Sequence, residues 1–163
     1  LSKQEKQAAI LKIKDEVLTD LFKAKPSTRQ MINSAAGYAV FDNGNVNLFF
    51  FSVGGGIGVV KNMKTSKYTY MKMAEAGVGL GLGIKDFRAV MVFHSQDVLK
   101  RFIEDGWQFG GHADAAAKAG DKGAAIAGEM VVDNITIFQM TESGLALQAQ
   151  LKGTKFWKDD ELN

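Results

Sequence analysis

The stretch of sequence that decides the fold is Gly77-Val78-Gly79-Leu80-Gly81-Leu82-Gly83-Ile84, in which glycine occupies every second position. In a β-strand, this alternation gives one face without side chains and one apolar face. A bare face lets another backbone or a helix approach closely, which offsets the roughly 0.5–1 kcal/mol that a strand glycine costs relative to alanine. The run Gly54-Gly55-Gly56-Ile57-Gly58 repeats the pattern. Both runs predict a strongly curved sheet, because glycine relieves crowding where strands bend.

A phosphate-binding loop is the functional alternative for these glycines, and their spacing excludes it. Neither run contains G-x-G-x-x-G, and no glycine in the chain is followed by lysine, as a P-loop requires. Disorder is also excluded, since 46% of the 163 residues are apolar and only one proline accompanies the 18 glycines. We therefore expect one folded domain over residues 1–163.

Helical periodicity opens the chain and gives way to strand alternation beyond Gly37. Residues 5–24 place their apolar side chains on one half of a helix, which Pro26 ends. We expect Ser27 to cap a short second helix that ends near residue 35, and Ser95 to cap a third helix over 96–105. The alternating segments predict strands over 38–41, 46–53, 57–61, 67–73, 78–85, 87–93, 135–140 and 145–156.

These elements predict an α+β fold. A strongly curved, mostly antiparallel, Gly-rich and barrel-like β-sheet forms the body over 37–158, and the helical segment 1–36 and the helix over 96–105 pack on it. Two hairpins are expected, one joining 57–61 to 67–73 and one joining 78–85 to 87–93. The Ala- and Gly-rich stretch 113–127 is compatible with a helix or with closely packed strands.

No pattern typical of catalysis or metal binding is present. His94 and His112 have no ligand spacing around them, so a histidine that bonds nearby groups at a loop edge is the simpler interpretation. The chain has no cysteine and no G-x-S-x-G motif, which excludes thiol nucleophiles and the serine elbow of hydrolases. A net charge of +2 argues against a nucleic-acid binder. We expect a protein that is not an enzyme and needs no metal or cofactor.

Positive charge is concentrated in the N-terminal segment. Residues 1–30 contain seven basic and four acidic residues, a net charge of +3, whereas the remaining residues have a net charge of −1. A basic amphipathic helix can lie at a membrane interface and attract anionic headgroups. The alternative, which the four acidic residues favour, is a helix that packs its apolar half on the sheet and leaves its lysines in water. The lysines of this candidate site are Lys12, Lys14, Lys23 and Lys25.

A second basic patch surrounds the tip of the first predicted hairpin. It consists of Lys61, Lys64 and Lys67, with no acidic residue between them. These side chains are a further candidate for binding lipid headgroups. The alternative is that they protect an edge strand against pairing with another chain.

Several segments, in order, resemble the SYLF domain family over roughly residues 30–158. They are Ala35-Ala36-Gly37-Tyr38-Ala39-Val40-Phe41, Gly54-Gly55-Gly56-Ile57-Gly58-Val59-Val60, Glu75-Ala76-Gly77-Val78-Gly79-Leu80-Gly81-Leu82-Gly83, Asp86-Phe87-Arg88-Ala89-Val90, Phe109-Gly110-Gly111-His112-Ala113-Asp114-Ala115 and Gly153-Thr154-Lys155-Phe156-Trp157. The resemblance implies a lipid-binding module. Eukaryotic relatives bind phosphoinositides and are linked to actin patches, and their N-terminal basic segment is implicated in membrane contact.

The resemblance also implies a stand-alone bacterial member located in the cell envelope. We expect it to be periplasmic or anchored to the outer membrane, with an N-terminal signal removed ahead of Leu1, and to bind anionic membrane lipids. No apolar run is long enough for a transmembrane helix. The alternative is a non-catalytic structural or scaffolding protein, which forms a homo-oligomer or binds a protein partner through Phe49, Phe50 and Phe51.

Overall fold

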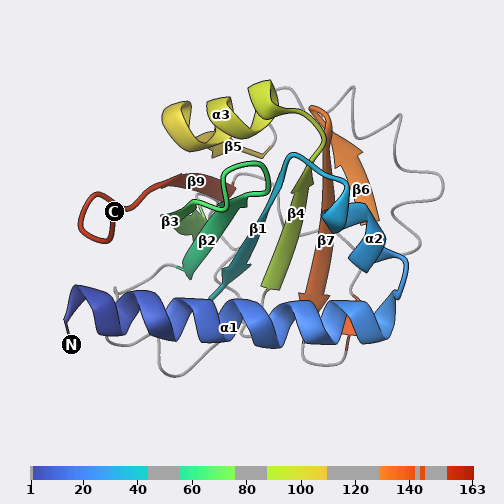
Figure 1. Ribbon diagram of the computed structural model, residues 1–163, viewed down its shortest axis with the longest axis horizontal. Coiled ribbons are helices and arrows are strands. Elements are labelled where there is room, and N and C mark those ends of the chain that lie inside the picture. Colours follow the sequence, from blue (N-terminus) through green and yellow to red (C-terminus); the bar gives the residue numbers. More distant parts are fainter. Residues whose placement is uncertain (1, 44–55, 76–87, 110–128, 142–143, 146–153) are drawn as a thin grey trace.

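The computed structural model describes residues 2–43, 56–75, 88–109, 129–141, 144–145 and 154–163 (Figure 1). Its helices are α1 (Lys3–Ala24), α2 (Thr28–Asn33) and α3 (Gln96–Asp105). Its strands are β1 (Gly37–Asp42), β2 (Gly56–Asn62), β3 (Tyr68–Glu75), β4 (Arg88–Phe93), β5 (Trp107–Gln108), β6 (Glu129–Val132), β7 (Ile135–Thr141), β8 (Gly144–Leu145) and β9 (Thr154–Lys158).

Side-chain caps define where the two longer helices begin. The Ser2 hydroxyl accepts from the Glu5 N–H at 3.1 Å, and the Glu5 carboxylate accepts from the Ser2 N–H at 3.0 Å, which forms a capping box on α1. The Ser95 hydroxyl accepts from the Val98 N–H at 3.2 Å and caps α3, which ends at Asp105 as predicted and has Gly106 as its C-cap. The capping role predicted for Ser27 is wrong, because its backbone is already helical and its side chain accepts no cap hydrogen bond.

The strands form one strongly curled antiparallel sheet in the order β5-β9-β3-β2-β1-β4-β7-β6, with β8 paired to β7. Every described pairing is antiparallel, which confirms the predicted α+β fold class. The hairpin between β2 and β3 is confirmed, with Lys61 opposite Tyr68.

The α1 helix covers one face of this sheet (Figure 1). Its apolar half packs against strand residues such as Val40, Val59 and Phe138. This half is almost fully buried at Ile10, Ile13, Val17 and Leu21. The interpretation in which α1 packs on the sheet is therefore confirmed, and this apolar half is not available for insertion into a membrane.

The opposite face of the sheet carries α3 (Figure 1). A cluster of aromatic rings packs between this helix and the sheet. Phe102 of α3 lies with its ring centroid 4.8 Å from that of Phe93 and 5.8 Å from that of Phe156. Phe41 completes the cluster with an edge-to-face contact to Phe156 at 4.7 Å. The sheet thus has an apolar core on each of its two faces, which fixes α1 and α3 on opposite sides.

Among the described glycines, Gly58 shows how closely atoms of a neighbouring strand approach a residue without a side chain. Gly58 lies opposite Phe41 across the β1–β2 pair. A Cβ atom at Gly58 would lie 2.2 Å from Cδ1 of Phe41 and 2.5 Å from the backbone oxygen of Val40. The bare strand face predicted for Gly77, Gly79, Gly81 and Gly83 lies outside the described residues, as do the segments 46–53 and 113–127.

Three strand predictions need correction or completion. Segment 78–85, which is predicted to form a hairpin with 87–93, lies outside the described residues, and both edges of Arg88–Phe93 are paired along their whole length, with β1 and with β7. The predicted strand 145–156 is described only at its two ends, which pair with β7 and β3 respectively. The alternation of apolar and polar residues did not predict β5 and β6, because these strands have only two and four residues.

Candidate functional site

The predicted basic face of α1 carries charges of both signs. Lys12 and Lys23 are exposed, as the helical pattern predicts. The acidic residues on the same helix are also exposed, and they are Glu5, Asp15, Glu16 and Asp20. The outer face of α1 is therefore not a uniform positive surface, which weakens its attraction for anionic headgroups.

Lys14 is buried at the junction between α1 and the sheet. Its Nζ donates to Asp15 Oδ1 at 2.6 Å and lies 5.5 Å from the centroid of the Tyr68 ring. Burial lowers the pKa of Lys14, but the hydrogen bond to Asp15 and the nearby Tyr68 outweigh this effect and hold that pKa above its ordinary value. Lys14 is therefore bound within the fold instead of facing a lipid surface.

Lys25 is also used by the fold. Its ammonium group forms an ion pair with Glu129 of β6 and lies 5.7 Å from the centroid of the Phe138 ring. A second ion pair joins the same helix to the sheet, from Arg88 to Asp20 at 2.9 Å. These contacts anchor the C-terminal half of α1, so only Lys12 and Lys23 of the four predicted helix lysines are free of ion pairs within the described residues.

The three lysines of the β2–β3 hairpin are held on an ordered turn, which we call the lysine hairpin (Lys61, Lys64 and Lys67). The Asn62 side-chain oxygen accepts from the N–H groups of Lys64 at 2.9 Å and Thr65 at 3.2 Å. Lys64 and Lys67 are exposed, and neither forms an ion pair among the described residues. The structure thus presents two cations from a preformed turn.

Tyr68 links the lysine hairpin to α1. The Nζ atom of Lys61 lies 5.6 Å from the centroid of the Tyr68 ring, and Lys14 contacts the same ring. Tyr38 of β1 is buried and lies opposite Lys61 of β2, and burial together with Tyr68 raises the pKa of Tyr38 well above the ordinary value. The two predicted basic patches therefore meet at one tyrosine, which the sequence pattern did not reveal.

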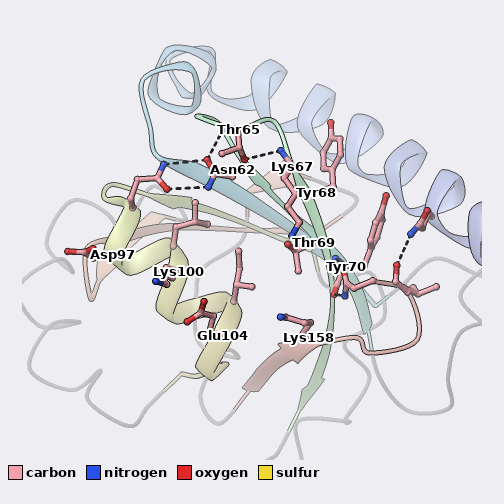
Figure 2. Close-up of a pocket in the computed structure, with 16 residues that line it drawn as sticks. Asn62, Thr65, Lys67, Tyr68, Thr69, Tyr70, Asp97, Lys100, Glu104 and Lys158 are labelled. Carbon is pink, nitrogen blue, oxygen red and sulfur yellow. Dashed lines mark hydrogen bonds between the residues drawn. The ribbon is translucent and has the colours of Figure 1, made fainter.

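A cavity of about 500 Å³ opens beside the lysine hairpin (Figure 2). One wall comes from α3, and the other walls come from β3, the end of β9 and the C-terminal turn. Charged side chains of both signs line it, namely Lys67, Asp97, Lys100, Glu104 and Lys158. Lys67 belongs to both the hairpin and the cavity, so the two form one continuous candidate site.

A second cavity, of about 730 Å³, lies on the other flank of α3. Its charged lining is mainly acidic, with Asp97, Asp105 and Asp133 against the single base Arg101. This balance of charge repels anionic headgroups, so we place the candidate lipid site on the flank that carries the lysine hairpin.

The remaining sequence-based candidates contribute little to this site. His94 bonds through Nε2 to the Thr136 hydroxyl of β7 at 2.6 Å, in a structural role just after the end of β4. No group of potential metal ligands is found in the described part of the chain, and His112 and Phe49–Phe51 lie outside it. Among the helices described, none combines the length and hydrophobicity needed to cross a bilayer.

Two comparisons relate the chain to known proteins. A family model described as Ysc84, a Las17-binding protein actin regulator, matches residues 74–163. The curated protein beta cell expansion factor A of Aeromonas veronii is 34% identical over 159 residues, which cover 98% of this chain. The match spans 59% of that relative's length.

Proposed function

The chain belongs to the Ysc84 (SYLF) family, and on that premise we propose that it is a non-catalytic module that binds anionic phospholipid headgroups at a membrane surface. The family and the relative are named for regulation and for a growth effect, and neither name refers to a reaction. A binding role agrees with the described surface, which offers cationic groups beside a cavity.

The observation that supports this proposal most directly is the lysine hairpin. Its exposed ammonium groups, on Lys64 and Lys67, are free of ion pairs within the described residues and are presented by a hydrogen-bonded turn. A basic residue close to an anionic membrane contributes about 1 kcal/mol of attraction. Because the turn is already ordered, little conformational entropy is lost when it meets the surface.

The predicted helix site takes a smaller part in the proposal. Lys12 and Lys23 are exposed and add to the attraction at long range, but exposed carboxylates accompany them on α1. Lys14 and Lys25 stay with their partners in the fold. We therefore assign the main contact to the lysine hairpin, with α1 in a supporting role.

Co-sedimentation with vesicles tests the proposal. The protein is expected to sediment with phosphatidylcholine vesicles that contain phosphatidylglycerol, and to remain in solution with phosphatidylcholine alone. The double variant Lys64→Glu, Lys67→Glu is expected to lower the affinity by at least tenfold, since two basic contacts of about 1 kcal/mol each are lost. The matched control is Lys12→Glu, Lys23→Glu, which changes the net charge equally on the outer face of α1.

The two variants separate the site from the function. A larger loss in the hairpin variant supports the assigned contact, whereas equal losses would show that only the net charge matters and would overturn it. If the parent protein binds none of the vesicles, the membrane-binding function itself is wrong.

We further propose that this module acts in the bacterial cell envelope. Fractionation of cells that express the full-length protein tests this location, and recovery from the cytosol alone would contradict it. Light scattering of the purified chain tests the alternative role in self-association, which predicts a mass above that of one 17.7 kDa chain.

A further inference from the structure

Side chains of both charges line the cavity beside the lysine hairpin. Lys67, Lys100 and Lys158 contribute three positive charges, and Asp97 and Glu104 contribute two negative charges. Within the described residues, none of these five side chains takes part in an ion pair. A ligand that carries a single charge would satisfy one set and be repelled by the other.

The charged groups that line the cavity come from different elements. In Figure 2, Lys100 and Glu104 project from α3, while Lys67 and Lys158 project from the strand side. Lys100 and Glu104 are one helical turn apart on α3, and in Figure 2 the Lys158 side chain extends toward Glu104. This arrangement matches a small molecule with an anionic and a cationic end.

Polar and apolar side chains share the lining between these charges, and a hydrogen bond ties two of the walls together. Leu99 and Ile103 of α3 and Leu162 of the C-terminal turn line the cavity. The Asn62 side chain donates to Gln96 at 3.2 Å, which ties the hairpin to the start of α3. A preformed cavity of this size accommodates a small ligand without large rearrangement.

We propose that this cavity binds a phosphodiester joined through two carbons to a primary ammonium group, the chemistry of an ethanolamine headgroup. The lysines bind the phosphate, and Glu104 accepts hydrogen bonds from the ammonium. A trimethylammonium group lacks those donors and is disfavoured. This inference rests on the proposed membrane function, since Lys67 is shared with the lysine hairpin.

Titration of the protein with soluble headgroups, followed by NMR of the backbone amides, tests the proposal. The probe is glycerophosphoethanolamine, and the controls are glycerol 3-phosphate, which lacks the ammonium, and glycerophosphocholine, which lacks its N–H donors. Glycerophosphoethanolamine is expected to shift the amides of Tyr70, Leu99 and Lys158 and to bind more tightly than either control. Equal binding of all three compounds, or no shift at these amides, would overturn the proposal.

Single substitutions distinguish this cavity from the lysine hairpin. Glu104→Gln is expected to weaken glycerophosphoethanolamine binding about tenfold and to leave glycerol 3-phosphate binding no weaker than before. Lys64→Glu, on the hairpin but outside the cavity lining, is expected to leave both soluble ligands unaffected. If Lys64→Glu weakens glycerophosphoethanolamine binding and Glu104→Gln does not, the assignment of the ligand to the cavity is contradicted.

Vesicles separate a membrane source from a soluble one. At a fixed phosphatidylglycerol content, replacing phosphatidylcholine by phosphatidylethanolamine is expected to strengthen binding, and Glu104→Gln is expected to remove that gain. If the soluble probe binds but the vesicles give no gain, the ligand is a free compound of the same chemistry. If vesicle binding does not depend on phosphatidylglycerol while glycerophosphoethanolamine still binds, the membrane role proposed for the lysine hairpin is wrong. The assignment of the soluble ligand to the cavity then stands.

Discussion

The side-chain amide of Asn163 is hydrogen-bonded to both backbone polar groups of Tyr70, as a residue of a neighbouring strand would be. Its Oδ1 accepts from the Tyr70 N–H at 2.7 Å, and its Nδ2 donates to the Tyr70 carbonyl at 2.7 Å and to the Asp159 carbonyl at 2.6 Å. The pairing of β3 with β9 ends at Met71 and Lys158. Asn163 therefore extends the ladder by one position and fixes the turn that walls the cavity.

Replacing this amide is expected to destabilise the protein. Asn163→Ala removes three hydrogen bonds and leaves partly buried backbone groups unpaired, which costs about 1–3 kcal/mol. Urea unfolding followed by circular dichroism measures the change. Asn33→Ala, at an exposed position on α2, serves as the control and is expected to have little effect. Equal stability of the two variants would contradict a structural role for Asn163.

Two neighbouring lysines of the predicted membrane face should behave differently. Lys25→Glu places a second carboxylate beside Glu129, whose side chain is only 16% exposed, and is expected to cost about 2 kcal/mol. Lys23 is exposed, so Lys23→Glu is expected to change the free energy of unfolding by less than about 0.5 kcal/mol. Thermal unfolding of both variants tests this difference. A neutral Lys25→Glu would show that the ion pair does not anchor α1.

The two serines predicted as helix caps offer a matched test. Ser95→Ala removes the hydrogen bond to the Val98 N–H and is expected to destabilise the protein by about 1 kcal/mol. Ser27→Ala removes no cap hydrogen bond and is expected to be close to neutral. Denaturant unfolding distinguishes them, and a larger loss for Ser27→Ala would reverse the assignment of the caps.

Two glycines of β2, which are separated by Ile57, should also differ in their tolerance of alanine. In Gly58→Ala the new methyl group would meet the Phe41 ring and the Val40 backbone oxygen, and overpacking of this kind costs about 1–3 kcal/mol or more. In Gly56→Ala the nearest atom, at 2.6 Å, is the terminal methyl of Met73, which can move. The melting temperature of Gly58→Ala is therefore expected to be lower than that of Gly56→Ala. A higher melting temperature for Gly58→Ala would contradict the close packing at Phe41.

Stability should fall in alkaline solution. Burial raises the pKa of Tyr38 and of Tyr70, and the pKa of Lys14 is also raised, so the folded chain holds these protons more tightly than the unfolded chain. Their contribution is complete below the ordinary pKa values, which are about 10, and is lost as pH rises beyond them. Melting temperatures between about pH 8 and pH 11 measure the loss. Tyr38→Phe is expected to make the melting temperature fall less steeply with pH. An unchanged slope of melting temperature against pH would exclude Tyr38 as a cause.

The helices and the hairpin around the lysines could be predicted because their signals are local. Apolar periodicity and Pro26 define α1, and the turn after Asn62 defines the β2–β3 pair. The partners of β4 could not be predicted, because β1 and β7 come from distant parts of the chain and alternation does not encode pairing. The fold class was thus accessible from pattern, whereas the sheet order was not.

The candidate site divides in the same way. The hairpin lysines stood out because no acidic residue interrupts them. Lys25 looked equally suitable, but its partner Glu129 lies 104 residues further along the chain. Lys14 gave a warning signal, since it falls within the apolar half of α1, where it is now buried against Tyr68. The cavity joins residues from α3, β3 and the C-terminal turn, which no local pattern brings together.

The burial of α1 depends on residues that are synthesised after it. Its apolar half is covered by β1, by strands as late as β7 and by Leu162 of the C-terminal turn. At roughly 5–20 residues per second, the ribosome needs on the order of ten seconds to deliver those partners. During translation the helix is therefore a nascent amphipathic segment without its sheet, and its apolar stripe stays uncovered until the later strands have been made.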